Sequence, residues 1–167
     1  MPPLLEERSD CSRCAALCCI AYPSEDMPGF SASKEAGEKC PKLGKDGRCT
    51  IYETREEEGF AGCVRYECFG AGQHVTETLF GGGPPDPDPS ILARMVDAFL
   101  AMRPVSDLSF LARKLARETR KEEARANAEA LAIELAEIAG SCEGLFQTRA
   151  LGRIERELRA LYRSTAS

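Results

Sequence analysis

Cysteines are the residues in this sequence whose type and spacing could do chemistry. The chain has nine of them in 167 residues, and eight lie in its first half in three groups. The groups are Cys11, Cys14, Cys18 and Cys19; Cys40 and Cys49; and Cys63 and Cys68. Thiolates are soft ligands that favour zinc, iron–sulfur clusters or copper(I) and exclude magnesium and calcium. The groups therefore predict a metal site of the iron–sulfur or zinc type, with these eight cysteines as candidate ligands.

The spacing within the first group narrows the kind of site. Two residues separate Cys11 from Cys14, which lets both sulfurs reach one metal centre. Cys18 and Cys19 are adjacent, and adjacent side chains tend to diverge, so a polynuclear cluster or two neighbouring centres fits the pair more easily than one zinc ion. The number of thiols permits two four-cysteine sites, one four-cysteine iron–sulfur cluster with spare thiols, or a shared polynuclear site.

A disulfide framework is the competing explanation of so many cysteines. Disulfides persist in oxidising compartments, whereas the N-terminal sequence lacks the basic start and apolar run of a secretory signal. We therefore expect a cytoplasmic protein whose thiols stay reduced and available to metal. No stretch approaches the roughly twenty apolar residues of a membrane span, so no membrane partner is expected.

Charge is distributed unequally along the chain. Residues through Phe80 carry nine Lys and Arg against fourteen Asp and Glu, and the remainder carries thirteen of each. Nucleic-acid binders need a positive surface that displaces counterions from phosphate. Neither part supplies one, and we expect no nucleic-acid partner.

Composition divides the chain into three parts. Residues 1–80 are a cysteine-rich module behind a short helical or frayed lead at 1–10; the module has few apolar runs, so bound metal is expected to hold it together. Residues 81–89 are a Gly/Pro linker that excludes helix interior and sheet. Residues 90–167 form a helical region. The predicted fold class is mostly α, with an irregular cysteine-rich metal-binding module and a small helical bundle or hairpin at the C-terminus.

Helix signals follow the linker. Asp88 and Pro89 predict the start of a first helix as its N-cap and first-turn residue, Pro104 predicts its end, and Ser106 or Asp107 predicts the start of a second. The charged run over 113–125 predicts a solvated face or an exposed bend. Two apolar seams predict further helices, one at Ala128, Leu131, Leu135, Ile138 and Cys142 and one at Leu151, Ile154, Leu158 and Leu161. Their heptad-like spacing predicts a protein partner or self-association.

The order of the cysteine motifs resembles a known family. C-x2-C-x3-C-C, C-P-x-L, G-x-C-x-I-Y-E-x-R and a final C-x4-C, over residues 11–70, are similar to the zinc- or iron-chelating domain also called the YkgJ or CxxCxxCC family. The resemblance implies metal chelation by Cys11, Cys14, Cys18, Cys19, Cys40, Cys49 and Cys63, with Cys68 joining them. Three residues stand between Cys14 and Cys18 where the family has two, and Glu56 stands where it has proline. The segment from Cys68 to Gln73 is also similar to the cysteine-rich leader ahead of pentapeptide repeats in some bacterial proteins.

Few other residues suggest chemistry. His74 is the only histidine, expected as an exposed loop residue, with a place in a site as the alternative. Cys142 is expected to fill the core. The sequence has no phosphate-binding loop and no Ser–His–Asp pattern. The predicted function is metal binding with an electron-transfer, sensing or structural role; the alternatives are a metal- or cluster-dependent enzyme and a protein-interaction module with a structural metal.

Overall fold

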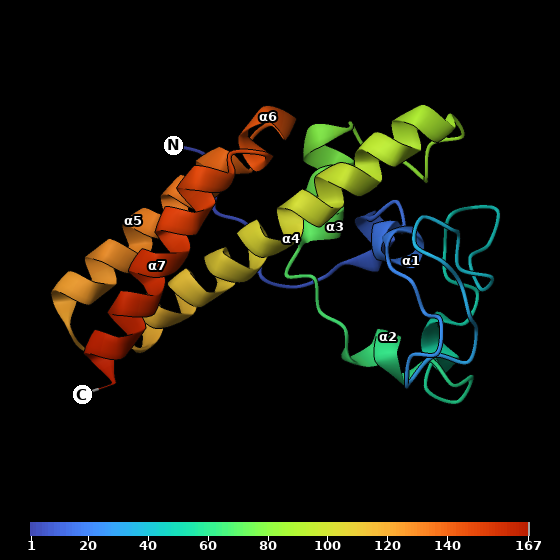
Figure 1. The fold of residues 1–167 in the computed structure, drawn as a ribbon, viewed down its shortest axis with the longest axis horizontal. Coiled ribbons are helices and arrows are strands. Elements are labelled where there is room, and N and C mark those ends of the chain that lie inside the picture. The colour runs from blue at the N-terminus through green and yellow to red at the C-terminus, as the bar shows by residue number, and fades with distance from the viewer. Residues whose placement is uncertain (167) are drawn as a thin grey trace.

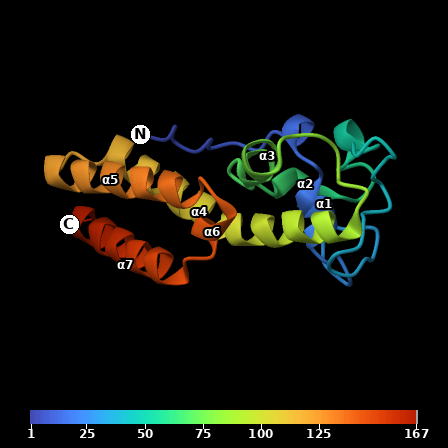
Figure 2. The same ribbon diagram turned by 90° about the horizontal axis from the view of Figure 1, so that it is seen from above.

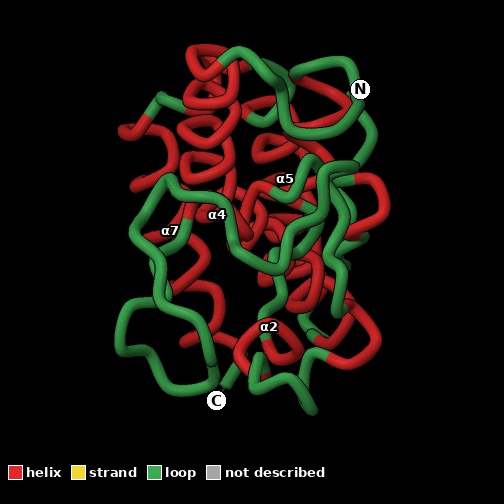
Figure 3. Tube along the Cα trace, turned by 90° about the vertical axis from the view of Figure 1, so that its right-hand side faces the viewer, coloured by secondary structure: helices red, strands yellow, loops and turns green. Residues whose placement is uncertain are grey.

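The molecule is elongated, with two ends of unlike construction. The computed structural model describes residues 1–166, and over this range it contains helices and loops but no strand (Figure 3). Loops and short helical turns make one end, and long helices make the other (Figures 1 and 2). The predicted fold class, mostly α with an irregular cysteine-rich module and a small C-terminal bundle, is confirmed.

The helical elements fall into a short series and a long series. The short ones are the 3-10 turn η1 (Cys11–Arg13), α1 (Leu17–Ala21), the 3-10 turn η2 (Tyr52–Thr54), α2 (Ala61–Arg65), α3 (Ala71–Gln73) and the π-helical segment η3 (His74–Leu79). The long ones are α4 (Pro89–Glu118), α5 (Glu122–Ile138) and α7 (Thr148–Thr165), with the single turn α6 (Cys142–Leu145) between α5 and α7.

Helix α4 joins the two ends of the molecule. Asp88 caps it by accepting a hydrogen bond from the Ser90 amide, and Pro89 occupies its first turn, as predicted. The predicted end at Pro104 and the predicted new start at Ser106 or Asp107 are wrong, because α4 runs through them without a break. Pro104 lies on the exposed side of the helix, near exposed Leu100. The carbonyl freed by the missing Pro104 N–H therefore faces water, while buried Met102 and Val105 hold the helix on its other side.

The far half of α4 forms a small bundle with α5 and α7. Its buried face carries the small residues Ser106, Ser109 and Ala112, which let a neighbouring helix approach closely. The charged run over 113–125 contains the exposed turn between α4 and α5, as predicted. The predicted seams are buried through Ala128, Leu131, Leu135 and Ile138 in α5 and through Ile154 and Leu158 in α7.

The N-terminal segment is an extended strap along α4, visible in Figure 2. The prediction of a helical or frayed lead is wrong, since residues 1–10 contain no helix and Leu5 is buried. The Leu5 carbonyl accepts a hydrogen bond from Arg113. The Glu7 carboxylate pairs with Arg113 at 3.2 Å and with Arg117 at 2.7 Å. These contacts lead the chain to Cys11.

Hydrocarbon packing reaches into the cysteine-rich end. One continuous cluster of buried residues joins Leu17 and Val75 from that end to Phe99 and Met102 of α4. The Tyr22 ring meets the Phe99 ring edge to face, with centroids 5.8 Å apart. The expectation that the module lacks a core of its own overlooked this contribution from α4, which appears in the sequence only beyond the linker. The linker itself lies against the module, because a Cβ at Gly47 would stand 2.5 Å from Pro85.

Candidate metal centre

The eight predicted cysteines all lie at the loop-rich end, around the short helix α1. Cys11 begins η1, Cys18 and Cys19 are in α1, and Cys63 is in α2. The other four, Cys14, Cys40, Cys49 and Cys68, stand in the connecting loops. All eight are free thiols; Cys11 is exposed, Cys68 is buried, and the rest are half-buried. Three separate stretches of chain thus bring their thiols to one end of the molecule.

A tether from the C-terminal end of α1 positions the loop that carries Cys40. The Cys40 amide donates to the Cys19 carbonyl at 3.0 Å, and the Gly37 amide donates to the Ile20 carbonyl at 2.9 Å. The buried Lys34 ammonium donates to the Ile20 carbonyl at 3.1 Å and also to the Tyr22 carbonyl. Carbonyls at a helix end lack partners within the helix, so this lysine satisfies them and closes the loop over α1.

A tight turn brings Cys49 back beside the segment that follows Cys40. Leu43 and Cys49 form an isolated antiparallel bridge. The Gly44 amide donates to the Arg48 carbonyl at 2.8 Å, and the Gly47 amide donates to the Gly44 carbonyl at 3.0 Å, with Gly47 at a φ of 76°. This turn folds Cys49 toward Cys40.

The third group is held by α2 and by the N-terminal strap. The Gly62 amide donates to the Gly29 carbonyl at 2.9 Å, which places the α2 turn with Cys63 against the 29–31 loop. At Cys68, the amide donates to the Ser9 hydroxyl at 2.9 Å, and this hydroxyl lies 3.1 Å from the Cys68 sulfur. Glu67 binds the Ser9 amide at 2.7 Å. Ser9 therefore fixes both the backbone and the sulfur of Cys68.

Gly72 lets two of the thiols lie side by side. A Cβ at this position would stand 2.5 Å from the Cys14 sulfur and 3.9 Å from the Cys68 sulfur. Both sulfurs are therefore close to one point, and a side chain at residue 72 would displace the Cys14 sulfur. The approach also needs Ala16 in the left-handed region, at a φ of 55°, which costs about 1–2 kcal/mol for a residue with a Cβ. This strained residue reverses the chain between Cys14 and Cys18.

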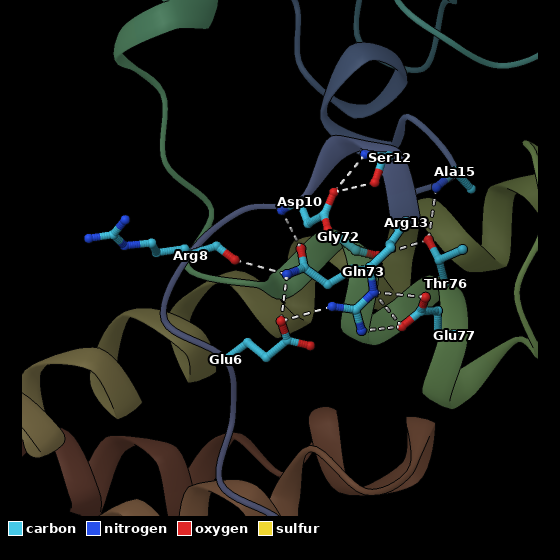
Figure 4. A network of polar contacts seen from close by, with 10 residues as sticks. All are labelled: Glu6, Arg8, Asp10, Ser12, Arg13, Ala15, Gly72, Gln73, Thr76 and Glu77. Atoms are coloured by element: carbon cyan, nitrogen blue, oxygen red, sulfur yellow. Dashed lines mark hydrogen bonds and ion pairs between the residues drawn. The ribbon is translucent and has the colours of Figure 1, made fainter.

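A polar network around α3 holds the segment before Cys11 (Figure 4). The buried Gln73 amide group accepts from the Asp10 N–H at 3.0 Å and donates to the Arg8 carbonyl at 2.8 Å. The Thr76 hydroxyl accepts from the Ala15 N–H at 2.9 Å. At the surface, Arg13 pairs with Glu77 and with Glu6. The network fixes the chain on both sides of η1 and so orients Cys11 and Cys14.

The thiols influence one another electrostatically. The hydrogen bond between Cys18 and Cys19 lowers the pKa of Cys19 to about 7, assisted by the charges of Lys34 and Arg55, and raises the pKa of Cys18 well above its usual value. Burial raises the pKa of Cys14 and of Cys63 to about 11. Among the thiols whose pKa is shifted, Cys19 is the one most readily ionised.

The arrangement gathers soft donors without forming a finished site. Among residues 1–166, no three His, Cys, Asp or Glu side chains are already placed to hold a metal ion. The donors fit a thiophilic metal by their chemistry, and two cations, Lys34 and Arg55, lie close enough to offset thiolate charge. Binding would need the sulfurs to draw together.

The two residues outside the groups have structural surroundings. His74 is half-buried in η3, and its Nε2 lies 2.9 Å from the Ala139 carbonyl, so the expectation of an exposed loop histidine is wrong. Cys142 packs against the hydrophobic core from α6, as expected. Near Cys14, a hollow of about 280 Å³ is lined by Arg13, Arg48 and Glu77.

Sequence reasoning missed the side chains that support the thiols. Ser9, Lys34 and Gln73 act on backbone groups or on a sulfur, and Ser9 and Gln73 reach partners 59 to 65 residues away. Only Gln73 carried a local signal, since an amide beside buried Ala71 and Gly72 needs partners.

Together, the fold and the site define a mostly helical, cysteine-rich protein with its thiols collected at one end. No family model matches the chain, and no solved structure matches it. The chain is similar to an uncharacterized protein, YybG, of Bacillus subtilis (strain 168), with 35% identity over 100 residues. These residues are 60% of this chain and 36% of the relative, so the match spans about a third of the relative's length. No helix among residues 1–166 is long and apolar enough to cross a membrane.

Proposed function

We propose that this protein binds a metal, as an iron–sulfur cluster or as zinc, through the thiolates of Cys11, Cys14, Cys18, Cys19, Cys40, Cys49, Cys63 and Cys68. The observation that carries the proposal is the collection of eight free thiols from separate stretches of chain around α1. The resemblance of the motifs to the YkgJ or CxxCxxCC family supports it, as does the placement of Lys34 and Arg55 beside Cys19.

The proposed role is electron transfer, sensing or structural support in the cytoplasm. Bound metal would supply a redox centre or a crosslink between loops. The protein supplies the remaining parts: Gly72 leaves room for two sulfurs, Ser9 fixes Cys68, and Lys34 closes the Cys40 loop. Each of these residues places a thiol without being a ligand itself.

Metal analysis on protein that has never met air tests the proposal. We expect zinc or iron in the purified protein, and a visible absorption band if iron–sulfur is present. The Cys142→Ser variant serves as the matched control and should keep the full metal content. Colourless protein that holds neither zinc, iron nor copper, even after anaerobic reconstitution, would overturn the proposal.

An interaction module with a structural metal is the second candidate. Its support is a groove of about 420 Å³ between α4 and α7, lined by Leu108, Leu111, Leu158 and Tyr162, with Leu111 39% exposed. A protein partner or a second copy would cover this apolar surface. Light scattering and crosslinking of wild type and Leu111→Asp test it: a complex that the substitution abolishes, with metal content unchanged, favours this candidate.

A further inference from the structure

The eight thiols divide by position into two groups of four. We name Cys11, Cys14, Cys18 and Cys68 set A, and Cys19, Cys40, Cys49 and Cys63 set B. Each set takes members from more than one of the three groups seen in the sequence. The division follows from the contacts that place each sulfur and from which thiols pack against the hydrophobic core.

Set A gathers on the side of α1 that faces α3. The sulfurs of Cys14 and Cys68 both lie within 4 Å of the Cβ position that Gly72 leaves vacant. Cys11 and Cys14 close the η1 turn, in which the Cys14 amide donates to the Cys11 carbonyl at 3.4 Å. Cys14 and Cys18 both pack against the hydrophobic core to which buried Cys68 belongs. Three of these thiols thus lie against one core, and the η1 turn adds the fourth, Cys11.

Set B gathers on the side that carries the long loop. The Cys40 amide is bound to the Cys19 carbonyl at 3.0 Å, and the 43–49 turn returns Cys49 to Cys40. Cys63 joins them from α2, which lies among the loops and apart from α3 (Figure 1). After burial, the charges of Cys19, Cys40 and Cys49 also raise the pKa of Cys63. All three neighbours of Cys63 named here belong to set B.

The adjacent pair in α1 separates the sets. Successive residues on an α-helix point about 100° apart, so Cys18 and Cys19 face different neighbours although they adjoin in the chain. Their thiols still hydrogen-bond to each other, and the charge of Cys19 also reaches Cys11. The two groups are therefore contiguous and share α1 as their common wall.

We propose that the eight cysteines form two four-thiolate metal sites, one from set A and one from set B, that meet at the Cys18–Cys19 pair. The inference rests on the proposed function, and it names the number and membership of its sites. Four thiolates satisfy one tetrahedral zinc ion or one iron–sulfur cluster. A four-thiolate zinc centre carries a charge of about −2. Lys34 and Arg55 lie beside set B, and the Ser9 hydroxyl lies 3.1 Å from the sulfur of Cys68 in set A.

Zinc stoichiometry of paired variants tests the division. Wild type reconstituted with zinc under nitrogen should hold about two ions per chain. Cys14→Ser/Cys68→Ser and Cys49→Ser/Cys63→Ser should each hold about one, and the mixed pair Cys68→Ser/Cys63→Ser should hold almost none, with Cys142→Ser at the wild-type value. If wild type holds no zinc, the proposed function fails as well. If wild type holds zinc and either within-set pair of substitutions removes all of it, only the division is overturned.

A measurement on unaltered protein guards against variants that fail to fold. Wild type receives one equivalent of zinc and is then treated with a thiol-alkylating reagent, and the protected cysteines are mapped by mass spectrometry of peptides. Protection should fall on the members of one set together. Protection spread evenly over all eight, or a protected quartet that combines Cys14 with Cys63, would show a shared polynuclear site and overturn the division.

Discussion

The two ends of this molecule are ordered by different means. From residue 22 to residue 59 no apolar side chain is buried, and the buried residues there are Ser24, Lys34 and Gly47. In α5 and α7, by contrast, the inward positions are filled by Leu131, Leu135, Ile154 and Leu158. The helical end is stabilised by hydrocarbon that leaves water, and the loop end is held by turns, a buried ammonium and hydrogen bonds.

The difference teaches where a metal would matter. A segment without an apolar core gains little free energy from solvent exclusion, so any ligand that crosslinks it contributes directly to its folding. Cys40 and Cys49 lie inside the segment without buried apolar residues, whereas Cys14 and Cys68 lie at its border with the core. The two sets of thiols therefore differ in how much hydrophobic support they have.

Removal of metal should have the largest effect, and it should loosen the loop-rich end while the helical end stays unchanged. Structural zinc contributes about 10–16 kcal/mol in zinc-finger peptides, so a chelator should raise amide hydrogen exchange sharply across residues 22–59. Exchange in α5 should stay as it was, because its core is independent of sulfur. Hydrogen-exchange mass spectrometry of loaded and chelated protein measures both. Equal changes at the two ends would contradict the comparison.

A cavity in the helical core should destabilise the helical end and leave metal binding at the loop-rich end unchanged. Leu135 is fully buried in α5, and Leu135→Ala should lower the free energy of unfolding by about 2–5 kcal/mol. The metal content should remain that of wild type. Denaturant titration by circular dichroism gives the first value and elemental analysis the second, with exposed Leu4→Ala as the control. A metal content that falls together with the free energy of unfolding would show that the two ends are not independent.

Loss of the α3 network should have an intermediate effect at the loop end. Gln73→Leu keeps the volume but leaves the Asp10 N–H and the Arg8 carbonyl without their partner, at a cost of about 1–3 kcal/mol. We also expect weaker zinc binding in a competition with a chromogenic chelator, since the chain that leads to Cys11 is freed. Gln147→Leu, an exposed glutamine beside α7, is the matched control. An unchanged affinity would remove Gln73 from the support of the thiols.

Relief of the strained turn should have the smallest effect and the opposite sign. Ala16→Gly removes a Cβ from a left-handed residue and should stabilise the protein by about 0.5–1 kcal/mol after the extra entropy of glycine in the unfolded chain. Thermal unfolding of the chelated protein measures it, with Ala126→Gly on the exposed face of α5 as a control that should destabilise. If Ala16→Gly were less stable than wild type, the packing of the Ala16 methyl group would outweigh the strain of its left-handed backbone.

Sequence patterns correctly predicted the elements that interactions within a few residues determine. The spacing of Leu131, Leu135 and Ile138 predicted α5, and Asp88 with Pro89 predicted the start of α4, because periodicity and capping act within a few residues. The end assigned to Pro104 was wrong since tertiary packing of the opposite helix face outweighs one lost hydrogen bond. The 44–47 turn was predictable for the same reason as the helices.

The rest depends on contacts between distant segments. Nothing near Lys34 in the sequence indicates that its ammonium closes the end of α1, and nothing near Ser9 points to Cys68. His74 was placed in a loop because glycines precede it, yet its ring is anchored at the end of α5 by the Ala139 carbonyl. The cysteines themselves were visible in the sequence, but the division between sets A and B required their placement around α1.

Helix α4 has a mechanical consequence for this molecule. Its 30 residues make a rod about 45 Å long. Two contacts hold the rod near its middle: Arg103 donates to the Cys68 carbonyl at 2.6 Å, and Phe110 stacks on Phe69. The rod is a lever that pivots at this contact with the Cys68 backbone. A tilt of about 5° around residue 103 moves the C-terminal end of the rod, about 22 Å away, by about 2 Å, so a small adjustment around Cys68 is carried to the place where α5 and α7 meet solvent.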